Sequence, residues 1–345
     1  MTPVTTISEL RQISLNALSQ ALAGARRVGL VNFPNHGNPG DPAIWLGTRS
    51  LLRELGVEIV YSAAWWNFDP RLASRSLKGA PVLLNGGGNF GDLYAGQQGT
   101  RETVLQTMRD VPVIQMPQSI HFRDPARLEK VRHMIASHGG VTLMTREHKS
   151  AGIVRDAFGL EPILSPDHAL ALSPVLPAAQ PHSDIVWIGR QPGDVEFLAS
   201  AAPPPAAGIA SYEWMNGIWD DQAAWDQEGL DALLTNARLV ERHRERGGLS
   251  KRDNARAAQT FEPLAVRWVD YGMRVLAGGR VVVTDKLHGH IFCTLLGLPH
   301  VVLDNSYGKV SGMLDAWTGN LPGVHRASDG DAAWAMAVQL VEERR

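Results

Sequence analysis

The segment Thr284–His290 (TDKLHGH) combines a cation, an imidazole and a helix start. It follows an apolar run typical of a buried strand, and Asp285 is a credible N-cap for the apolar helix pattern that continues from it. Lys286 and His288 would then lie on the first helical turn, where free N–H groups and the helix dipole favour an anion. The segment predicts a phosphate clamp with a titratable group beside it, against the alternative of two solvated side chains on a surface helix.

A glycine-rich turn, Asn85–Asp92 (NGGGNFGD), directly follows another apolar run. Three consecutive glycines cost folding entropy and offer no side chain to pack, so we expect the backbone around Asn85, Gly86 and Gly87 to face a ligand. A tight packing turn is the alternative. No Lys-Ser or Lys-Thr pair follows and the spacing is not GxGxxG, so neither of those two nucleotide-binding motifs is present.

The turn Asn32–Pro42 (NFPNHGNPGDP) is a third candidate. Asp41 followed by Pro42 predicts a helix start, with a carboxylate N-cap and proline at the first helical position. Asn35 and the two glycines after it would bring the backbone close to a ligand at that helix end. They would equally serve a loop that only needs positive φ angles, and the local sequence leaves both interpretations open.

Further polar turns follow other apolar runs. One contains Gln118, Ser119 and His121, and another, Pro166–His168, contains Asp167. Because the carboxyl ends of parallel strands meet at one edge of a sheet, we expect these turns to gather around one ligand site.

Three more cations lie where they would reach the same anion. Arg146 directly follows a strand-like run and suits a carboxylate or phosphate clamp, with a surface ion pair to a nearby glutamate as the alternative. Lys309 ends a polar turn that also contains Ser306, and Arg190 follows a strand-like run in the second half. Together these cations predict an anionic ligand.

The first half alternates short β-branched runs with helical stretches, which is typical of a parallel, doubly wound α/β sheet. The expected strands are Val28–Asn32, Val57–Tyr61, Pro81–Asn85, Pro112–Met116, Val141–Met144 and Pro162–Leu164, and the expected helices are Pro42–Leu55, Thr100–Arg109, Pro125–Ser137 and Glu147–Phe158.

An Ala/Pro-rich stretch, Ala169–Ser183, reads as a linker before a second α/β half. We therefore predict two Rossmann-like domains facing each other across a cleft, at 1–175 and 183–345, with an irregular insertion that contains a helix near 192–254. The elements expected in the second half are Asp184–Ile188, Val281–Thr284 and Val301–Asp304 as strands, and Pro263–Ala277, Leu287–Leu296 and Ala332–Glu343 as helices.

Bulk composition excludes several classes of protein. The net charge of −2 gives no field that favours nucleic acid, so no nucleic-acid partner is expected. No apolar run reaches the roughly 20 residues that span a bilayer, no signal peptide is apparent, and the helical pattern from Ile7 to Leu22 is expected to pack on a domain. The lone Cys293 lies among apolar residues and is expected to be a core residue. We expect a cytoplasmic protein. Peripheral docking at the inner membrane face through a partner protein stays open as an alternative.

The 12 histidines do not form a metal motif. There is no HExxH and no cysteine cluster, and His288 and His290 are two positions apart on a helix, where side chains point to different faces. No metal is therefore predicted. A serine hydrolase is not supported either, because no GxSxG elbow occurs.

Six segments in order resemble the polysaccharide pyruvyl transferase family, especially its bacterial exopolysaccharide branch. They are NHGNPGDPAIWLG, LNGGGNFGDL, QMPQSIHF, TREHKS, SPDHAL and TDKLHGHIFCTLLGLPHVVLDNSYGK, between about Asn32 and Lys309, with a gap at 192–254. The resemblance implies a fold similar to GT-B glycosyltransferases. It also implies transfer of pyruvate from phosphoenolpyruvate to a sugar, as a ketal, during assembly of exopolysaccharide repeat units, with phosphoenolpyruvate as co-substrate and no cofactor.

The resemblance also implies roles for individual residues. The family's cation before Leu-His maps to Lys286, its histidine to His288 and its Arg-Glu arginine to Arg146, and these three are the expected catalytic residues. The family usually has arginine where this chain has Lys286, and a lysine offers a point charge rather than a bidentate fork. The family's Arg-x-Asp-x-Glu segment is matched loosely from Arg190. Donor binding is expected of Asn35, Asp41, Asn85, Gly86, Gly87, Gln118, Ser119, Arg190, His290, Ser306 and Lys309, and acceptor binding of His121, Asp167, Tyr212, Trp214 and Trp219.

Two other functions stay open at this point. A nucleotide-sugar glycosyltransferase of the same architecture needs the same anion site, plus base and ribose pockets that the sequence does not reveal. A carbohydrate-binding scaffold in an assembly complex is the non-enzymatic alternative, although mere sugar binding needs no anion clamp. The acceptor is expected to be a lipid-linked saccharide. Two interpretations stay open for the aromatic residues Tyr212, Trp214 and Trp219: they stack on sugar rings of the acceptor, or they form a small local core.

Overall fold

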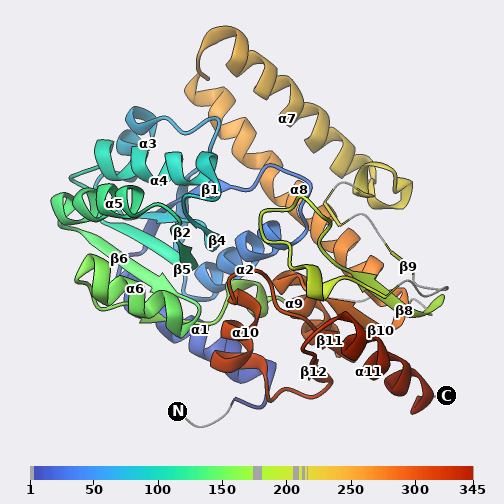
Figure 1. Ribbon diagram of the computed structural model, residues 1–345. Helices are drawn as coiled ribbons and strands as arrows, with labels where there is room; N and C mark the ends of the chain where they lie inside the picture. The colour runs from blue at the N-terminus through green and yellow to red at the C-terminus, as the bar shows by residue number, and fades with distance from the viewer. Residues whose placement is uncertain (1–3, 174–180, 205–209, 212–213, 216, 345) are drawn as a thin grey trace.

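The computed structural model describes residues 4–344, apart from 174–180, 205–209, 212–213 and 216. Two parallel β-sheets, each covered by helices on both faces, lie beside each other (Figure 1). This confirms the predicted α/β class with two Rossmann-like domains. No helix in the described part of the chain is both long and apolar enough to cross a membrane.

The first sheet has the strand order β2-β1-β3-β5-β6-β7, with β4 added beside β5. Apolar side chains of α1, α2 and α8 pack on one face and those of α3, α4, α5 and α6 on the other. The strands are β1 Arg27–Phe33, β2 Glu58–Ala64, β3 Val82–Leu84, β4 Gly87–Gly91, β5 Val113–His121, β6 Val141–Thr145 and β7 Ile163–Leu164, and the helices are α1 Ile7–Leu22, α2 Gly40–Glu54, α3 Pro70–Leu77, α4 Ala95–Thr107, α5 Pro125–His138 and α6 His148–Phe158.

The second sheet has the order β12-β11-β10-β8-β9. It packs between α8 and α9 on one face and α11 on the other. The strands are β8 Ser183–Ile188, β9 Ala210–Ser211, β10 Gly279–Thr284, β11 His300–Val302 and β12 Val324–Arg326, and the helices are α7 Gln227–Arg246, α8 Lys251–Ala277, α9 Leu287–Leu296, α10 Lys309–Met313 and α11 Gly330–Glu342.

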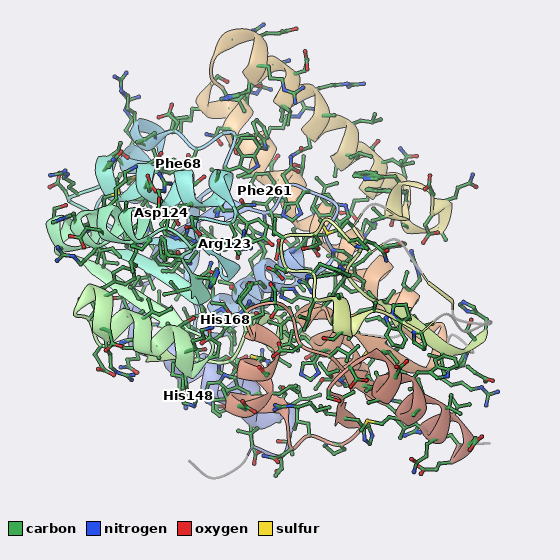
Figure 2. All side chains as sticks on the ribbon, viewed as in Figure 1. Phe68, Arg123, Asp124, His148, His168 and Phe261 are labelled. Carbon is green, nitrogen blue, oxygen red and sulfur yellow. The ribbon has the colours of Figure 1, made fainter. Side chains whose placement is uncertain are left out.

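Helix α8 joins the two sheets. It begins at Lys251, not at the expected Pro263, because proline is tolerated within this long, well-packed helix. It contacts α2 and β2 of the first sheet as well as α9 and β10 of the second. Phe261 of α8, labelled in Figure 2, stacks on Phe33 of β1 with ring centroids 4.1 Å apart.

Several local expectations about helix starts were wrong. Helix α2 begins at Gly40, so Asp41 lies inside the first turn and is not the N-cap. Helix α9 has Lys286 at its N-cap position, because the Asp285 carboxylate instead accepts the backbone N–H of Arg190 at 3.0 Å. Both carboxylates are thus used for contacts other than capping.

Other expectations about individual segments have mixed outcomes. Part of the glycine-rich turn is the strand β4, which pairs with β5. The expected linker, Ala169–Ser183, starts inside a buried 3-10 helix, His168–Ala171, that packs on α2, while residues 174–180 lie outside the described residues. The N-terminal helix and the buried position of Cys293 are confirmed.

Candidate functional site

A cavity of about 430 Å³ lies where the carboxyl edges of the two sheets meet. Turns after β1, β6, β8, β10 and β11 contribute its walls, which is where ligands bind in sheets of this kind. Its charged and aromatic lining includes His36, Asp41, Tyr94, Arg146, Arg190, Asp194, Glu196, Trp214, Lys286, His288 and Lys309. A larger groove of about 860 Å³ between α8 and β2 contains none of the expected site residues.

Arg146, Asp167 and His288 form a buried chain of charges at one end of the cavity. Arg146 Nη1 lies 2.6 Å from Asp167 Oδ2, and the same oxygen lies 3.7 Å from His288 Nε2. Burial alone would raise the pKa of Asp167, but His288 and Arg146 outweigh it and hold that pKa well below its usual range. Asp167 therefore stays ionised and sets the orientation of both partners.

Two glycines allow the cavity wall to approach these side chains. A β-carbon at Gly40 would overlap the imidazole of His288, because the first turn of α2 lies directly against that ring. A β-carbon at Gly88 would lie 2.8 Å from Arg146 Nη2. Glycine is required at both positions because the backbone lies so close to His288 and Arg146 that a larger residue would not fit. Both of these side chains are expected to contact the donor.

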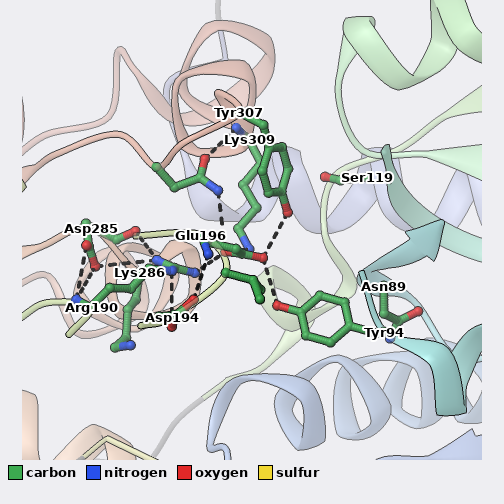
Figure 3. Close-up of polar contacts among 12 residues, drawn as sticks. Asn89, Tyr94, Ser119, Arg190, Asp194, Glu196, Asp285, Lys286, Tyr307 and Lys309 are labelled. Carbon is green, nitrogen blue, oxygen red and sulfur yellow. Dashed lines mark hydrogen bonds and ion pairs between the residues drawn. The ribbon is translucent and has the colours of Figure 1, made fainter. Parts of the chain in front are cut away.

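Glu196 is the centre of a second buried cluster (Figure 3). Its carboxylate pairs with Lys309 and Arg190, and it accepts hydrogen bonds of 2.9 Å from the hydroxyls of Tyr94 and Tyr307. Burial would raise the pKa of Glu196, but Lys309 and Arg190 lower it well below the usual range. The cluster holds two cations at the cavity wall in fixed positions.

Lys286 differs from these cations because its ammonium is free. No ion pair or side-chain hydrogen bond joins its Nζ to another residue in the described ranges. Burial and the charge of Arg190 lower the pKa of Lys286. No side chain caps α9, so the free ammonium and the open N-terminal N–H groups of that helix face the cavity together.

The opposite wall is built by the turn after β1. His36 Nε2 lies 3.3 Å from Asp41 Oδ2. The Asn38 side chain accepts the N–H of Gly40 at 3.0 Å and the indole N–H of Trp214 at 3.2 Å. Trp214 therefore lines the cavity in a fixed orientation.

Of the expected site residues, Asp41, Arg146, Arg190, Trp214, Lys286, His288 and Lys309 line the cavity. Four others support this lining from behind. Asp167 and Ser119 bind Arg146, the latter by accepting its Nε–H at 2.8 Å. Gln118 donates to the Asn85 carbonyl at 3.1 Å, and Asn85 is buried with a side-chain oxygen that has no hydrogen-bond partner.

The remaining expected residues that the structure describes do not line the cavity. Asn35 donates to Asn236, Gly86 and Gly87 pack against Ile44, and His121 stacks on Tyr307. His290 is fully buried between His300 and Thr318, Ser306 is exposed, and Trp219 stacks on Trp225 at the surface. Tyr212 lies outside the described residues.

Sequence reasoning missed His36, Tyr94 and Glu196. Glu196 ends the segment that only loosely matched the family's Arg-x-Asp-x-Glu pattern, and that match was the available signal. The local sequence gave no sign that Tyr94 or His36 belongs to the site. Tyr94 binds Glu196, which is distant in the chain, and His36 contacts Asp41 within a turn whose geometry the sequence does not predict. In the described part of the chain, no three potential metal ligands cluster.

Comparison with known proteins identifies the family of the chain. The polysaccharide pyruvyl transferase family model matches residues 38–307. Pyruvyl transferase 1 of Schizosaccharomyces pombe is 29% identical over 314 residues, which cover 86% of this chain and 70% of that protein. The putative pyruvyl transferase EpsO of Bacillus subtilis is 29% identical over 317 residues, which cover 89% and 90%.

A solved structure supports the fold alone. The crystal structure of an uncharacterized protein from Klebsiella pneumoniae matches with a TM-score of 0.60 at 17% identity, covering 92% of this chain and 98% of that one. The family model, in contrast, spans most of this chain and includes most of the residues that line the cavity, although His36 and Lys309 lie just outside it. The chain therefore belongs to the polysaccharide pyruvyl transferase family, a family of transferases.

Proposed function

We propose that the chain transfers pyruvate from phosphoenolpyruvate to a sugar of an exopolysaccharide repeat unit, as a ketal. The observation that carries this proposal is the free ammonium of Lys286 at the uncapped N-terminus of α9, in one cavity with Arg146 and His288. Phosphoenolpyruvate carries a phosphate ester and a carboxylate on the same carbon atom. Two cationic groups at neighbouring positions suit such a ligand.

The donor is expected to bind in one orientation. Lys286 and the α9 N–H groups hold the phosphate, as helix N-termini commonly do. Arg146 uses Nη1 and Nε for Asp167 and Ser119, which leaves Nη2 for the donor carboxylate next to Gly88. Arg190 and Lys309 also line the cavity, where both are paired with Glu196.

Ketal formation then requires proton transfer at carbon 3 of the enolpyruvyl group. His288 is the proposed general acid, a role commonly worth about 10²–10⁴ in rate. The Asp167 carboxylate lies 3.7 Å from its Nε2 and orients the imidazole toward the cavity. Protonation makes carbon 2 electron-deficient, so that a sugar hydroxyl adds and phosphate leaves.

The acceptor is proposed to be a lipid-linked saccharide. Trp214 reaches the cavity wall but is 4% exposed and packs against Phe292, which favours the small local core for this residue over stacking on a sugar. Two relatives are named as pyruvyl transferases, which supports the reaction class. The proposed location is the cytoplasm, with peripheral association at the membrane that holds such acceptors, and no cofactor is proposed.

Ligand-induced stabilisation tests the donor. Phosphoenolpyruvate at about 100 times its Kd should raise the free energy of unfolding by about 2.7 kcal/mol by mass action, and so raise the melting temperature, while UDP-sugars should not. The reverse result would favour a nucleotide-sugar glycosyltransferase.

Removal of the proposed acid tests the chemistry. His288→Ala should lower phosphate release from phosphoenolpyruvate by about 10²–10⁴-fold in the presence of acceptor. Near-full release by this variant would contradict the assignment. The exposed His133→Ala is the matched control, because His133 lies on α5 and its partners among the described residues are Glu129 and Arg132 on the surface.

A further inference from the structure

Asp41 differs from the other carboxylates that line the cavity. Glu196 pairs with Lys309 and Arg190, and Asp194 lies 3.6 Å from Arg190 Nε. Asp41, in contrast, has no lysine or arginine nitrogen within 4.0 Å among the residues that the structure describes, and its partner is His36. It is the cavity carboxylate whose charge no fixed cation neutralises.

The hydrogen bonds of His36 define which oxygen of Asp41 is held. His36 Nδ1 accepts the backbone N–H of Asn38 at 3.4 Å, so the proton on Nε2 is the one presented to Asp41 Oδ2, 3.3 Å away. Asp41 Oδ1 accepts no hydrogen bond from a described residue. It faces the glycine strand, since a β-carbon at Gly87 would lie 3.9 Å from it. One oxygen is anchored and the other is free to meet a ligand.

Asp41 is also ionised. Burial raises its pKa, but the hydrogen bond and charge of His36, with the charges of His288 and Lys309, outweigh burial and lower it. An ionised carboxylate would repel the phosphate and carboxylate of the donor, so a donor-binding role does not suit it. It suits a group that must accept a proton.

We propose that Asp41 is the general base for the attacking sugar hydroxyl and that His36 is the positioning residue that holds it; this rests on the proposed function. The hydroxyl becomes acidic as its oxygen bonds to an electron-deficient carbon 2, so a weak carboxylate base is sufficient. Inverting glycosidases use a carboxylate in the same way against an oxocarbenium-like carbon.

The proton balance of the reaction closes with this assignment. His288 gives its proton to carbon 3 while the first hydroxyl oxygen bonds to carbon 2 and its proton passes to Asp41. The second hydroxyl oxygen then bonds to carbon 2, the carbon–oxygen bond to phosphate breaks, and the second proton leaves with the phosphate. Exchange with water returns a proton to His288 and removes one from Asp41.

The test uses carbon-labelled phosphoenolpyruvate and a lipid extract from source cells that lack this protein, in which unmodified acceptor accumulates. Asp41→Asn should reduce label transfer to lipid by about 10²–10⁴-fold. It should still show the melting-temperature rise that phosphoenolpyruvate causes, because the change leaves the donor cations intact. Transfer within threefold of wild type would overturn the role of Asp41.

Two His36 variants test positioning and do not depend on the folding of Asp41→Asn. His36→Leu loses the N–H that holds Asp41 and should lower turnover more than acceptor affinity. His36→Gln keeps an N–H donor and should transfer label at least tenfold faster than His36→Leu. Equal rates for the two variants would overturn the positioning role. If the wild-type protein transfers no label, the proposed function itself fails, whatever the variants do.

Discussion

Lys286 lies where the resemblance to the family leads one to expect arginine, and its neighbours explain how a lysine can serve. Arg190 lies beside it and donates to the Asp285 carbonyl at 2.7 Å, while it also pairs with Glu196. The guanidinium next to the helix end is thus committed to protein contacts. Lys286 keeps its ammonium free, so it is the group that a phosphate can meet directly.

Replacing Lys286 should therefore weaken donor binding more than it affects folding. One charge-assisted hydrogen bond is worth about 1.5–3 kcal/mol, so Lys286→Ala should raise the Kd for phosphoenolpyruvate by roughly 10–100-fold. Lys286→Arg keeps the charge and is the control, with an expected Kd close to that of the wild type. Calorimetric titration measures both, and unchanged binding by Lys286→Ala would place the phosphate elsewhere.

At the level of single residues, the sequence predicted the cations of the cavity better than the carboxylates that pair with them. Residue type and strand ends were enough to identify Arg146, Lys286 and His288, because each directly follows a strand-like run. Glu196 could not be identified in this way. Its partners include Tyr94 in the first half of the chain and Lys309 in the second, so these contacts form only when both sheets have come together.

Among the elements, periodicity identified most strands and helices but not how they begin. Asp41 and Asp285 are favourable N-cap residue types, yet tertiary partners use both side chains instead. Pro263 lies within α8 because packing on both sides outweighs the lost hydrogen bond. The strand β4 was missed because a glycine run has no β pattern, and it forms by pairing with the C-terminal part of β5, beyond the residues of β5 that pair with β3.

The contact between α9 and β11 should make stability depend on pH. His290 Nδ1 and His300 Nε2 are 2.8 Å apart, and His300 Nδ1 donates to the Leu298 carbonyl. Burial lowers the pKa of His300 to about 4, and burial with the charge of His300 lowers that of His290 well below 6.5. The unfolded chain therefore binds more protons than the folded one below about pH 6.5, so stability should fall between about pH 6.5 and pH 4.

Urea unfolding at a series of pH values measures this loss. His300→Gln removes one titrating group and should make the free energy of unfolding less dependent on pH in that interval, although His168, whose pKa burial also lowers to about 4, keeps part of the slope. An unchanged slope in His300→Gln would show that the pair does not govern acid stability.

On the scale of the whole molecule, the site depends on how the two sheets are held against each other. Lys286 and Glu196 come from the second half and Arg146 and Asp41 from the first, so a shift between the sheets would separate donor-binding and proton-transfer groups. Helix α8 bridges them and is anchored to the first sheet through Phe261, which is buried against Phe33 and Trp45. The sequence predicted two α/β halves but gave no signal for this bridge, because its contacts are non-local.

Phe261→Ala should therefore damage both stability and activity from a position outside the cavity. Loss of a buried phenylalanine commonly costs about 3–5 kcal/mol. Because the lost contacts join α8 to the first sheet, calorimetry should show a lower and broader transition, with the two sheets unfolding less cooperatively than in the wild type. Leu234→Ala on the neighbouring α7 is the matched control, since Leu234 is 53% exposed and its loss should change stability by less than about 0.5 kcal/mol. A single sharp transition in Phe261→Ala, with unchanged label transfer, would show that the two halves hold the cavity together without α8.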